Sequence, residues 1–383
     1  LAGFLVFADP IKAGAAESLA RLDRLGIRVK ILTGDNDRVA RHACAALGLP
    51  VAGVLTGAEL ERLDDRALAD RLPATTIFAR LAPDQKLRVI RAQRALGVEV
   101  GFLGDGVNDA VALHGSDVGI SVDSASDVAK EAADVVLLEK DLGILADGVV
   151  EGRRIFANTI KYVLMGTSSN FGNMFSAAGA SLVLGFLPMT PTQILLNNFL
   201  YDVSEMTIPT DQVDEEQLRR PAHWDLRQIQ RFMLVFGPIS SLFDFLTFGL
   251  MLWVFHAGPS LFQSGWFVES LATQTLIIFV IRTRRTPFFR SRPSLALAAT
   301  SLACVALGAA IPFTPLGGLF GFSPLPAPFF AALGAMVTAY LILVETAKTL
   351  FYRERPRRRP LAVPVGGRER AIRRWTARWT HAA

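Results

Sequence analysis

The segment from Gly104 to Asp109 carries two carboxylates and a side-chain amide, Asp105, Asn108 and Asp109, directly after an apolar run. An apolar run followed at once by polar groups predicts a strand that ends at a ligand site, as in an α/β sheet. Carboxylate and amide oxygens are the ligands that Mg²⁺ prefers. The spacing therefore predicts that these three residues form a magnesium site.

Further polar groups stand beside predicted strands or helix starts. Thr33, Gly34 and Asp35 follow another apolar run, so the threonine hydroxyl and the backbone amides can cradle a phosphate. Lys86 stands at the start of a predicted helix, and Asp9 closes the first apolar stretch. Taken alone, each has an ordinary explanation as a turn, a solvated lysine or a helix cap. Around one sheet edge, together with the acids above, they are the groups that phosphoryl transfer needs, because there a protein mainly positions and neutralises charge.

The alternation of apolar and helical stretches along the chain predicts the strands and helices that position these groups. Residues 1–150 alternate short apolar or β-branched runs with helical stretches. This alternation predicts a Rossmann-like α/β fold, in which crossover helices connect the strands of one parallel sheet. Because the carboxyl ends of parallel strands lie at one edge of a sheet, we expect the polar groups to meet there.

The composition of the 383-residue chain is too apolar for an ordinary soluble enzyme, with 51% hydrophobic residues and a mean hydropathy of +0.35. Its two cysteines are too few for a disulfide framework and match no zinc-binding spacing. Apolar residues gather in six segments, each about long enough to cross a bilayer core of about 30 Å as a helix. The six predicted transmembrane helices, an all-α bundle, are residues 155–184, 189–209, 231–256, 265–281, 294–311 and 327–351.

The loops between these segments alternate in charge. Residues 185–191, 257–264 and 312–326 contain no Lys or Arg, whereas arginines gather in the other loops, at 219–231 and 282–292. The positive-inside rule then places the basic loops, both ends of the chain and the soluble part on the cytoplasmic side of the cell membrane. Buried helices of a large soluble protein would not show this alternation.

The chain thus divides into three predicted parts. Residues 1–150 are the α/β domain, residues 151–352 the six-helix transmembrane domain and residues 353–383 a basic cytoplasmic tail. The tail could contact anionic lipid headgroups or remain solvated. No feature of the chain indicates nucleic-acid binding.

Polar residues inside the predicted spans indicate where an ion would bind. Asn170 and Asn173 are three residues apart on one face of the first span, and Asn198 and Asp202 are four apart on one face of the second. Two neighbouring helices then offer the oxygen ligands that a hard cation takes. The alternative is that these side chains only hydrogen-bond one helix to another. Asp202 favours an ion site, because an acid inside a membrane is costly without a function.

Two further acids, Asp244 and Glu269, fall within the third and fourth predicted spans. They are weaker candidates for an ion site, since they could equally form a structural pair. The sequence does not decide between these interpretations.

These motifs resemble those of the P-type cation-transporting ATPases, which belong to the haloacid-dehalogenase-like phosphotransferases. Residues 33–35 match the family's TGD motif, residues 104–109 its GDGxND motif, Lys86 the lysine after P-x-Q, and Asp9 with Pro10 its DP segment. The resemblance implies that Thr33 and Lys86 contact the phosphoryl group of a phosphorylated aspartate, and that Asp9 and Gly34 lie at the cofactor, ATP. It also implies that Asp105 binds a catalytic Mg²⁺, with Asn108 and Asp109 supporting that site.

The membrane part is most similar to the bacterial magnesium-transporting branch of this family, through residues 193–202, 236–241 and 261–267. The resemblance implies that the six spans are the family's last six transmembrane helices, and that Asn170, Asn173, Asn198 and Asp202 occupy its ion-binding positions. The calcium pumps have an acid where Asn173 stands. Fewer carboxylates are compatible with one divalent ion that stays partly hydrated, since Mg²⁺ gives up its water reluctantly.

The resemblance implies the C-terminal part of an ATP-driven magnesium importer that works through an aspartyl phosphate. The family's phosphorylated aspartate in D-K-T-G, its actuator domain and its first four helices are not in this chain, so we expect the fragment alone to be inactive. Its partners would be the transported cation, membrane lipid and the missing N-terminal portion. The alternatives are a calcium or proton pump, a membrane-anchored phosphatase and a non-catalytic remnant.

Overall fold

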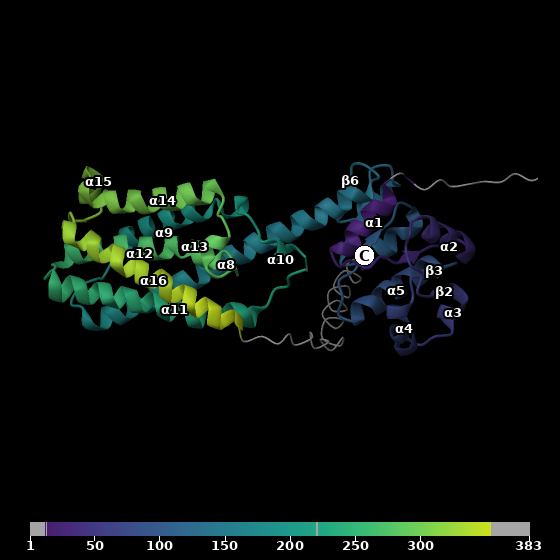
Figure 1. Cartoon of the computed structure of the whole chain (residues 1–383), viewed down its shortest axis with the longest axis horizontal. Coiled ribbons are helices and arrows are strands. Elements are labelled where there is room, and N and C mark those ends of the chain that lie inside the picture. Colours follow the sequence, from purple (N-terminus) through teal and green to yellow (C-terminus); the bar gives the residue numbers. More distant parts are fainter. Residues whose placement is uncertain (1–11, 13, 220, 354–383) are drawn as a thin grey trace, which may run out of the picture. The chain divides into compact units, whose positions relative to one another are not determined.

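The computed structural model describes residues 12, 14–219 and 221–353, which fall into two compact units that adjoin in sequence at Val150 and Glu151 (Figure 1). The first unit mixes helices with strands, and the second is helical. The expectations for Asp9 and for the basic tail after Arg353 lie outside the described residues.

The described residues of the first unit contain six short strands in two parallel sheets. One sheet has the order β1 (Ile31–Leu32), β3 (Ile77–Ala79), β2 (Val54–Thr56), and the other β4 (Gly101–Leu103), β5 (Val118–Val122), β6 (Val135–Leu137). The parallel pairings confirm the predicted α/β class. Among the described strands, β1 pairs with β3 and β4 with β5, so they form two sheets; the predicted first strand lies outside the described residues, and one continuous sheet stays a prediction. Alternation of strands and helices predicts parallel pairing, but it does not specify which strands become neighbours.

Seven α-helices of the described residues precede, connect or follow these strands. Polar side chains fix their first turns: Asn36 accepts a hydrogen bond from the amide of Arg38, and Thr56 forms a capping box with Glu59. The helices are α1 (Ala15–Arg24), α2 (Asp37–Ala46), α3 (Gly57–Glu61), α4 (Asp65–Arg71), α5 (Pro83–Ala95), α6 (Ala110–Gly115) and α7 (Asp127–Ala132).

Helix α5 connects the two sheets. Its adjacent residues Val89 and Ile90 lie in different apolar cores, and Leu32 of β1 packs against both cores. The helix begins with Pro83, and the Gln85 side chain accepts a hydrogen bond from the backbone amide that precedes the helix. This start places Lys86 in the first turn of α5, on the element that lies between the sheets.

The second unit is a bundle of long helices joined by short ones. The long helices are α8 (Leu142–Val183), which belongs to this unit from Glu151 onward, α9 (Pro191–Glu205), α11 (Leu226–Gly249), α12 (Pro259–Leu276), α14 (Leu295–Ala310) and α16 (Ala327–Arg353). The short ones are α10 (Glu215–Leu218), α13 (Ile278–Ile281), α15 (Pro315–Leu319) and the 3-10 turn η3 (Ile208–Thr210). A π-helical turn, η4 (Leu250–Val254), extends α11.

Four helical segments in the described residues are long and apolar enough to cross a membrane: Leu226–Val254, Pro259–Ile281, Leu295–Phe313 and Ala327–Arg353. They coincide with the last four of the six predicted spans. The first two predicted spans are helical as well, but α9 is 15 residues long and α8 carries several polar side chains. The helical part therefore contains four candidate membrane spans.

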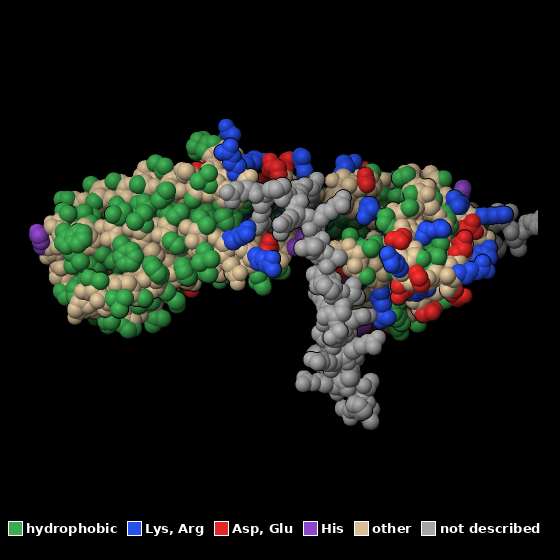
Figure 2. All heavy atoms as spheres, turned by 90° about the horizontal axis from the view of Figure 1, so that it is seen from below, with side chains coloured by type: hydrophobic (Ala, Val, Ile, Leu, Met, Phe, Trp, Pro, Cys, Tyr) green, Lys and Arg blue, Asp and Glu red, His purple; other side chains and the backbone are tan. Residues whose placement is uncertain are grey.

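Helix α12 forms the centre of the bundle. In the candidate span Pro259–Ile281, which begins with α12, 89% of the most apolar 18-residue stretch is buried inside the protein. Its Phe262, Trp266 and Phe267 are almost fully buried in the largest apolar core. The outer helices instead expose large apolar side chains, such as Leu302 of α14 and Ile342 of α16. Figure 2 shows hydrophobic side chains over much of the visible face of this unit. Such a surface suits a lipid environment.

Candidate functional site

The loop after β1 holds Thr33, Gly34 and Asp35 in a tight turn. The Thr33 amide donates to the carbonyl of Phe78 at 2.9 Å, which extends the pairing of β1 with β3. The Thr33 hydroxyl accepts from the Asp35 amide at 3.0 Å and donates to the Asp35 carboxylate at 2.9 Å. The hydroxyl therefore stands at the carboxyl end of β1, where the sequence predicts it.

The loop after β4 brings Asp109 back against Gly104. A Cβ atom on Gly104 would lie 2.7 Å from the Cβ atom of Asp109, so this approach requires glycine. A 3-10 turn, η2 (Val107–Asp109), carries Asn108 at its exposed central position. The GDGxND segment thus folds back on itself and presents its polar side chains at the end of β4.

Two lysines neutralise the two carboxylates of this segment. Lys86 Nζ lies 2.6 Å from Asp109 Oδ1, and the two side chains are only 12% and 15% exposed. Lys140 Nζ lies 2.7 Å from Asp105 Oδ2 in a more exposed pair. The ammonium groups supply the positive charge that a divalent cation would also supply to these oxygens. Lys140 was not anticipated, because no sequence pattern links it to a residue 35 positions earlier.

The structure brings together part of the predicted phosphoryl-transfer group. Lys86 of α5 contacts Asp109, and the Thr33 side chain contacts that of Asp35. Within the described part of this unit, no hydrogen bond or ion pair joins the β1 loop to Lys86 or Asp105. The roles of these residues at one phosphoryl site stay a prediction.

The four predicted ion ligands lie on α8 and α9. Asn170, Asn198 and Asp202 are exposed, while Asn173 is half-buried and accepts a hydrogen bond at 3.3 Å from the hydroxyl of Ser270 on α12. No hydrogen bond joins the α8 asparagines to the α9 pair among the described residues. Their service as ligands of one ion stays a prediction as well.

A cavity of about 430 Å³ lies between the first half of α8 and the end of α9. Asp202 lines it, together with Glu205 and Asn158, which the sequence reasoning missed. Its other lining residues are Ile155, Thr159, Tyr162, Met206, Ile208 and Pro209. Glu205 could have been found from the sequence, because it is an acid three residues after Asp202 near the end of the same predicted span.

Asp244 and Glu269 lie side by side in the bundle core. Asp244 of α11 accepts hydrogen bonds from the Ser176 hydroxyl at 2.6 Å and from the Trp266 indole at 2.8 Å. Both Glu269 side-chain oxygens are buried and lack a hydrogen-bond partner among the described residues. The arrangement fits the structural-pair interpretation.

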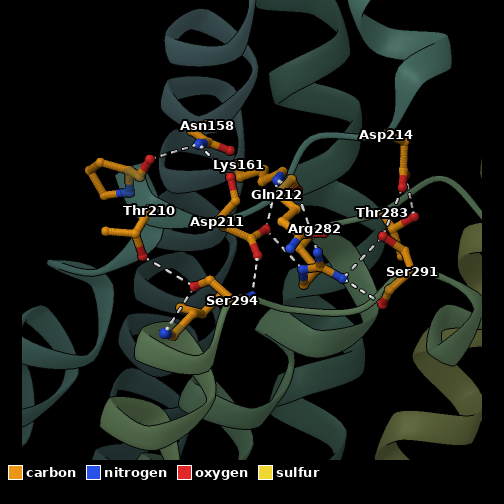
Figure 3. Close-up of polar contacts among 12 residues, drawn as sticks. Asn158, Lys161, Thr210, Asp211, Gln212, Asp214, Arg282, Thr283, Ser291 and Ser294 are labelled. Carbon is orange, nitrogen blue, oxygen red and sulfur yellow. Dashed lines mark hydrogen bonds and ion pairs between the residues drawn. The ribbon is translucent and has the colours of Figure 1, made fainter.

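A buried ion-pair network fixes the loop between α9 and α11, and it too was missed (Figure 3). The Asp211 carboxylate is fully buried and lies 2.7 Å from Lys161 Nζ of α8 and 2.8 Å from Arg282 Nε after α13. Arg282 also donates to the carbonyls of Ser291 and Arg292, both at 2.8 Å. Burial would raise the pKa of Asp211, but the hydrogen bond from Arg282 and the charge of Lys161 outweigh it and hold that pKa below its usual value.

Two family descriptions match the chain. Residues 1–117 match the family described as haloacid dehalogenase-like hydrolase, and residues 186–350 match the family described as cation transporting ATPase, C-terminus. The first match covers the predicted phosphoryl-transfer motifs, and the second covers three of the candidate membrane spans and all but the last three residues of the fourth.

Three curated relatives are similar to almost the whole chain, and each is described as a magnesium-transporting ATPase, P-type 1. The protein of Salmonella typhimurium strain 14028s is 49% identical over 357 residues, which are 92% of this chain and 40% of the relative. That of Escherichia coli K12 is 48% identical over the same share of each chain. A protein of Salmonella typhimurium strain LT2 is 46% identical over 91% of this chain and 39% of its own. The chain therefore spans about two fifths of the length of these relatives.

Proposed function

We propose, from the homology of this chain to the C-terminal region of the P-type cation-transporting ATPases, that it serves in an ATP-driven pump that imports magnesium. The observation that carries the proposal is the 49% identity that continues through both the α/β unit and the helical unit. Identity over both units supports a protein that couples phosphoryl chemistry to ion movement, rather than a phosphatase with a membrane anchor. The resemblance read from the sequence motifs is thereby confirmed at the level of the family.

In this proposal the α/β unit supplies the residues that bind the transferred phosphoryl group. Thr33, Gly34 and Asp35 would hold the phosphoryl oxygens through the hydroxyl and the backbone amides. Lys86 would neutralise negative charge on the phosphoryl group while its pair with Asp109 keeps it oriented. The aspartate that receives the phosphoryl group from ATP would lie in a part of the pump that precedes this chain.

The residues after β4 fit a magnesium ion. Two carboxylates and one amide stand within five positions, and the close approach of Asp109 to Gly104 holds one carboxylate in place. Asp105, with Asn108 and Asp109 in support, would hold the ion, which would supply charge neutralisation at the phosphoryl group. The ion pairs of Lys86 with Asp109 and of Lys140 with Asp105 support this proposal, because each places a positive charge beside one of the two carboxylates.

The helical unit would carry the ion path. We propose that α8 and α9 add two spans to the four candidates, which gives six, and that the basic loops lie in the cytoplasm. Asn170, Asn173, Asn198 and Asp202 would supply oxygen ligands to the transported ion. The boundaries of the domains would be residues 1–150, 151–352 and 353–383. The chain alone would be inactive, since its sequence contains no D-K-T-G segment.

Uptake by the complete pump in sealed vesicles tests this function. Right-side-out vesicles that enclose ATP and a magnesium-sensitive dye should report ATP-dependent entry of Mg²⁺, while matched vesicles with calcium- or pH-sensitive dyes should report none. Asp202→Asn should reduce Mg²⁺ uptake to background, whereas Glu216→Gln, at an exposed carboxylate of the following loop, should leave it unchanged. ATP-dependent calcium or proton movement without magnesium entry would replace the magnesium assignment, and normal uptake by Asp202→Asn would remove Asp202 from the ion path.

A further inference from the structure

The cavity between α8 and α9 is lined by oxygen atoms whose hydrogen-bonding capacity is not used. Asn158 is 3% exposed and Glu205 is 4% exposed, and the buried atoms Asn158 Oδ1 and Glu205 Oε1 have no hydrogen-bond partner in the described residues. A buried polar atom without a partner costs about 1–3 kcal/mol, so two at one cavity call for an explanation.

The orientation of Asn158 is fixed by its own hydrogen bonds. Its amide nitrogen donates to the carbonyls of Pro209 and Asp211, both at 3.1 Å (Figure 3). A flipped amide would place oxygen against two carbonyl oxygens, which is repulsive. The carbonyl oxygen of Asn158 is therefore kept on the other side of the amide, free to accept a ligand.

Glu205 lies three residues after Asp202, so both carboxylates project from one face of α9 toward the same cavity. The described residues that line this cavity include no Lys or Arg. The nearby ammonium of Lys161 is engaged by Asp211 at 2.7 Å and by the Gln212 carbonyl at 3.0 Å. Two carboxylates close together without a cation repel each other, and a bound cation relieves that repulsion.

The chemistry and size of the cavity select the ligand. Its polar groups include two carboxylates and an amide oxygen, which suit a hard divalent cation and would repel an anion. A water molecule takes about 30 Å³ in the liquid, so a cavity of about 430 Å³ has room for an ion with several waters. Mg²⁺ keeps several waters when it binds to few carboxylates.

We propose that Asn158, Asp202 and Glu205 form a binding site for a partly hydrated divalent cation in the α8–α9 cavity. The site lies nearer the α9–α11 loop than Asn170 and Asn173 do, and it adds Asn158 and Glu205 to the predicted ion path. Its assignment to the transported ion rests on the proposed function, but the binding of a divalent cation does not.

Direct binding to the 383-residue chain in lipid nanodiscs tests the site, with Mn²⁺ alone as the probe. Free Mn²⁺ gives an electron paramagnetic resonance spectrum that is lost on binding, and added Mg²⁺ should displace the bound ion. The Asp105→Asn background reduces binding at the proposed catalytic magnesium site. In that background, Glu205→Gln and Asp202→Asn should each weaken Mn²⁺ binding about tenfold or more, since the charge of the ligands sets divalent affinity.

Two comparisons separate ligand loss from damage to the fold. Glu216→Gln removes an exposed carboxylate that pairs with Arg285 outside the cavity, and it should leave Mn²⁺ affinity unchanged. Without divalent cations, Glu205→Gln should unfold at the same temperature as the parent chain or higher, because the charge of a buried carboxylate with one unpaired oxygen has been removed.

Unchanged Mn²⁺ affinity in Glu205→Gln, or no Mn²⁺ binding by the Asp105→Asn chain, would overturn the proposed site. Neither result bears on magnesium uptake by the complete pump, which tests the proposed function separately. If uptake failed while Glu205→Gln weakened Mn²⁺ binding, the cation site would stand and the transport assignment would fall.

Discussion

The Asp211 network offers the sharpest test of how the helical unit is held together. Replacing Asp211 by Asn keeps the size of the side chain but removes the charge that pairs with Lys161 and Arg282, whose side chains are 5% and 1% exposed. Breaking a buried ion pair costs about 3–5 kcal/mol, because the remaining charge is left without its partner. Here the Gln212, Ser291 and Arg292 carbonyls still accept from the two cations, so we expect the lower end, about 3 kcal/mol.

Thermal unfolding of the detergent-solubilised chain measures this cost. For a domain of 150–250 residues, 1 kcal/mol shifts the unfolding temperature by about 2–4 °C, so Asp211→Asn should lower it by about 6–12 °C. The control is Glu216→Gln, at the exposed pair with Arg285, where solvent screens the charges and little change is expected. Adding Lys161→Met to Asp211→Asn should recover part of the loss, because one of the two unpaired cations is removed.

An unfolding temperature of Asp211→Asn within 2 °C of the unaltered chain would refute this reasoning. It would mean that the backbone carbonyls alone satisfy Lys161 and Arg282, and that the carboxylate contributes no net stability. A large loss that Lys161→Met does not relieve would assign the effect to Arg282 alone.

Three further expectations follow from the same contacts. The folded-state pKa of Asp211 lies below its unfolded value of about 3.9, so the stability that its charge confers is fully present above that pH and is lost as pH falls through the lower folded value. The gap in unfolding temperature between Asp211→Asn and the unaltered chain should hence be constant from pH 8 to 5 and shrink below about pH 4. In the complete pump, Asp105→Asn should prevent labelling of the phosphoenzyme from ATP, and unchanged labelling would remove Asp105 from the magnesium site. Gly104→Ala should reduce labelling and cost about 1–3 kcal/mol, because its Cβ meets Asp109, whereas Gly106→Ala, whose Cβ has 3.8 Å to Asp109 Oδ2, should do neither.

The sequence predicted which segments are helices or strands and where the motifs follow them. It did not predict which strands pair with each other. The alternation in residues 1–150 gives parallel strands because crossover helices impose that direction, and TGD and GDGxND follow β1 and β4 as expected. The same alternation is silent on which strands pair, and the described strands form two sheets rather than one. Strands of two to five residues carry no register signal long enough to decide their neighbours.

Contacts between charged residues that lie far apart in the chain could not be predicted from the sequence. The arginines after the fourth predicted span were interpreted as an orientation signal, yet Arg282 is buried against Asp211, 71 residues earlier. The positive-inside rule counts charges in a loop and does not distinguish a solvated arginine from a paired one. Glu205 and Asn158 were missed because their roles depend on a cavity, and a cavity depends on how two helices pack rather than on the periodicity of either one.

The loop between α9 and α11 contributes Ile208 and Pro209 to the cavity and Asp211 to the buried network, and this makes the loop part of the proposed cation site. The Asp211 carbonyl accepts from the amide of Asn158, while its carboxylate holds Lys161 one turn further along α8. The carboxylate pairs fix the position of the loop, the loop carbonyls fix the Asn158 amide, and the amide keeps its oxygen free for a cation. A substitution at Asp211 therefore removes more than stability: once the loop is released, Asn158 can rotate and its oxygen is no longer preorganised.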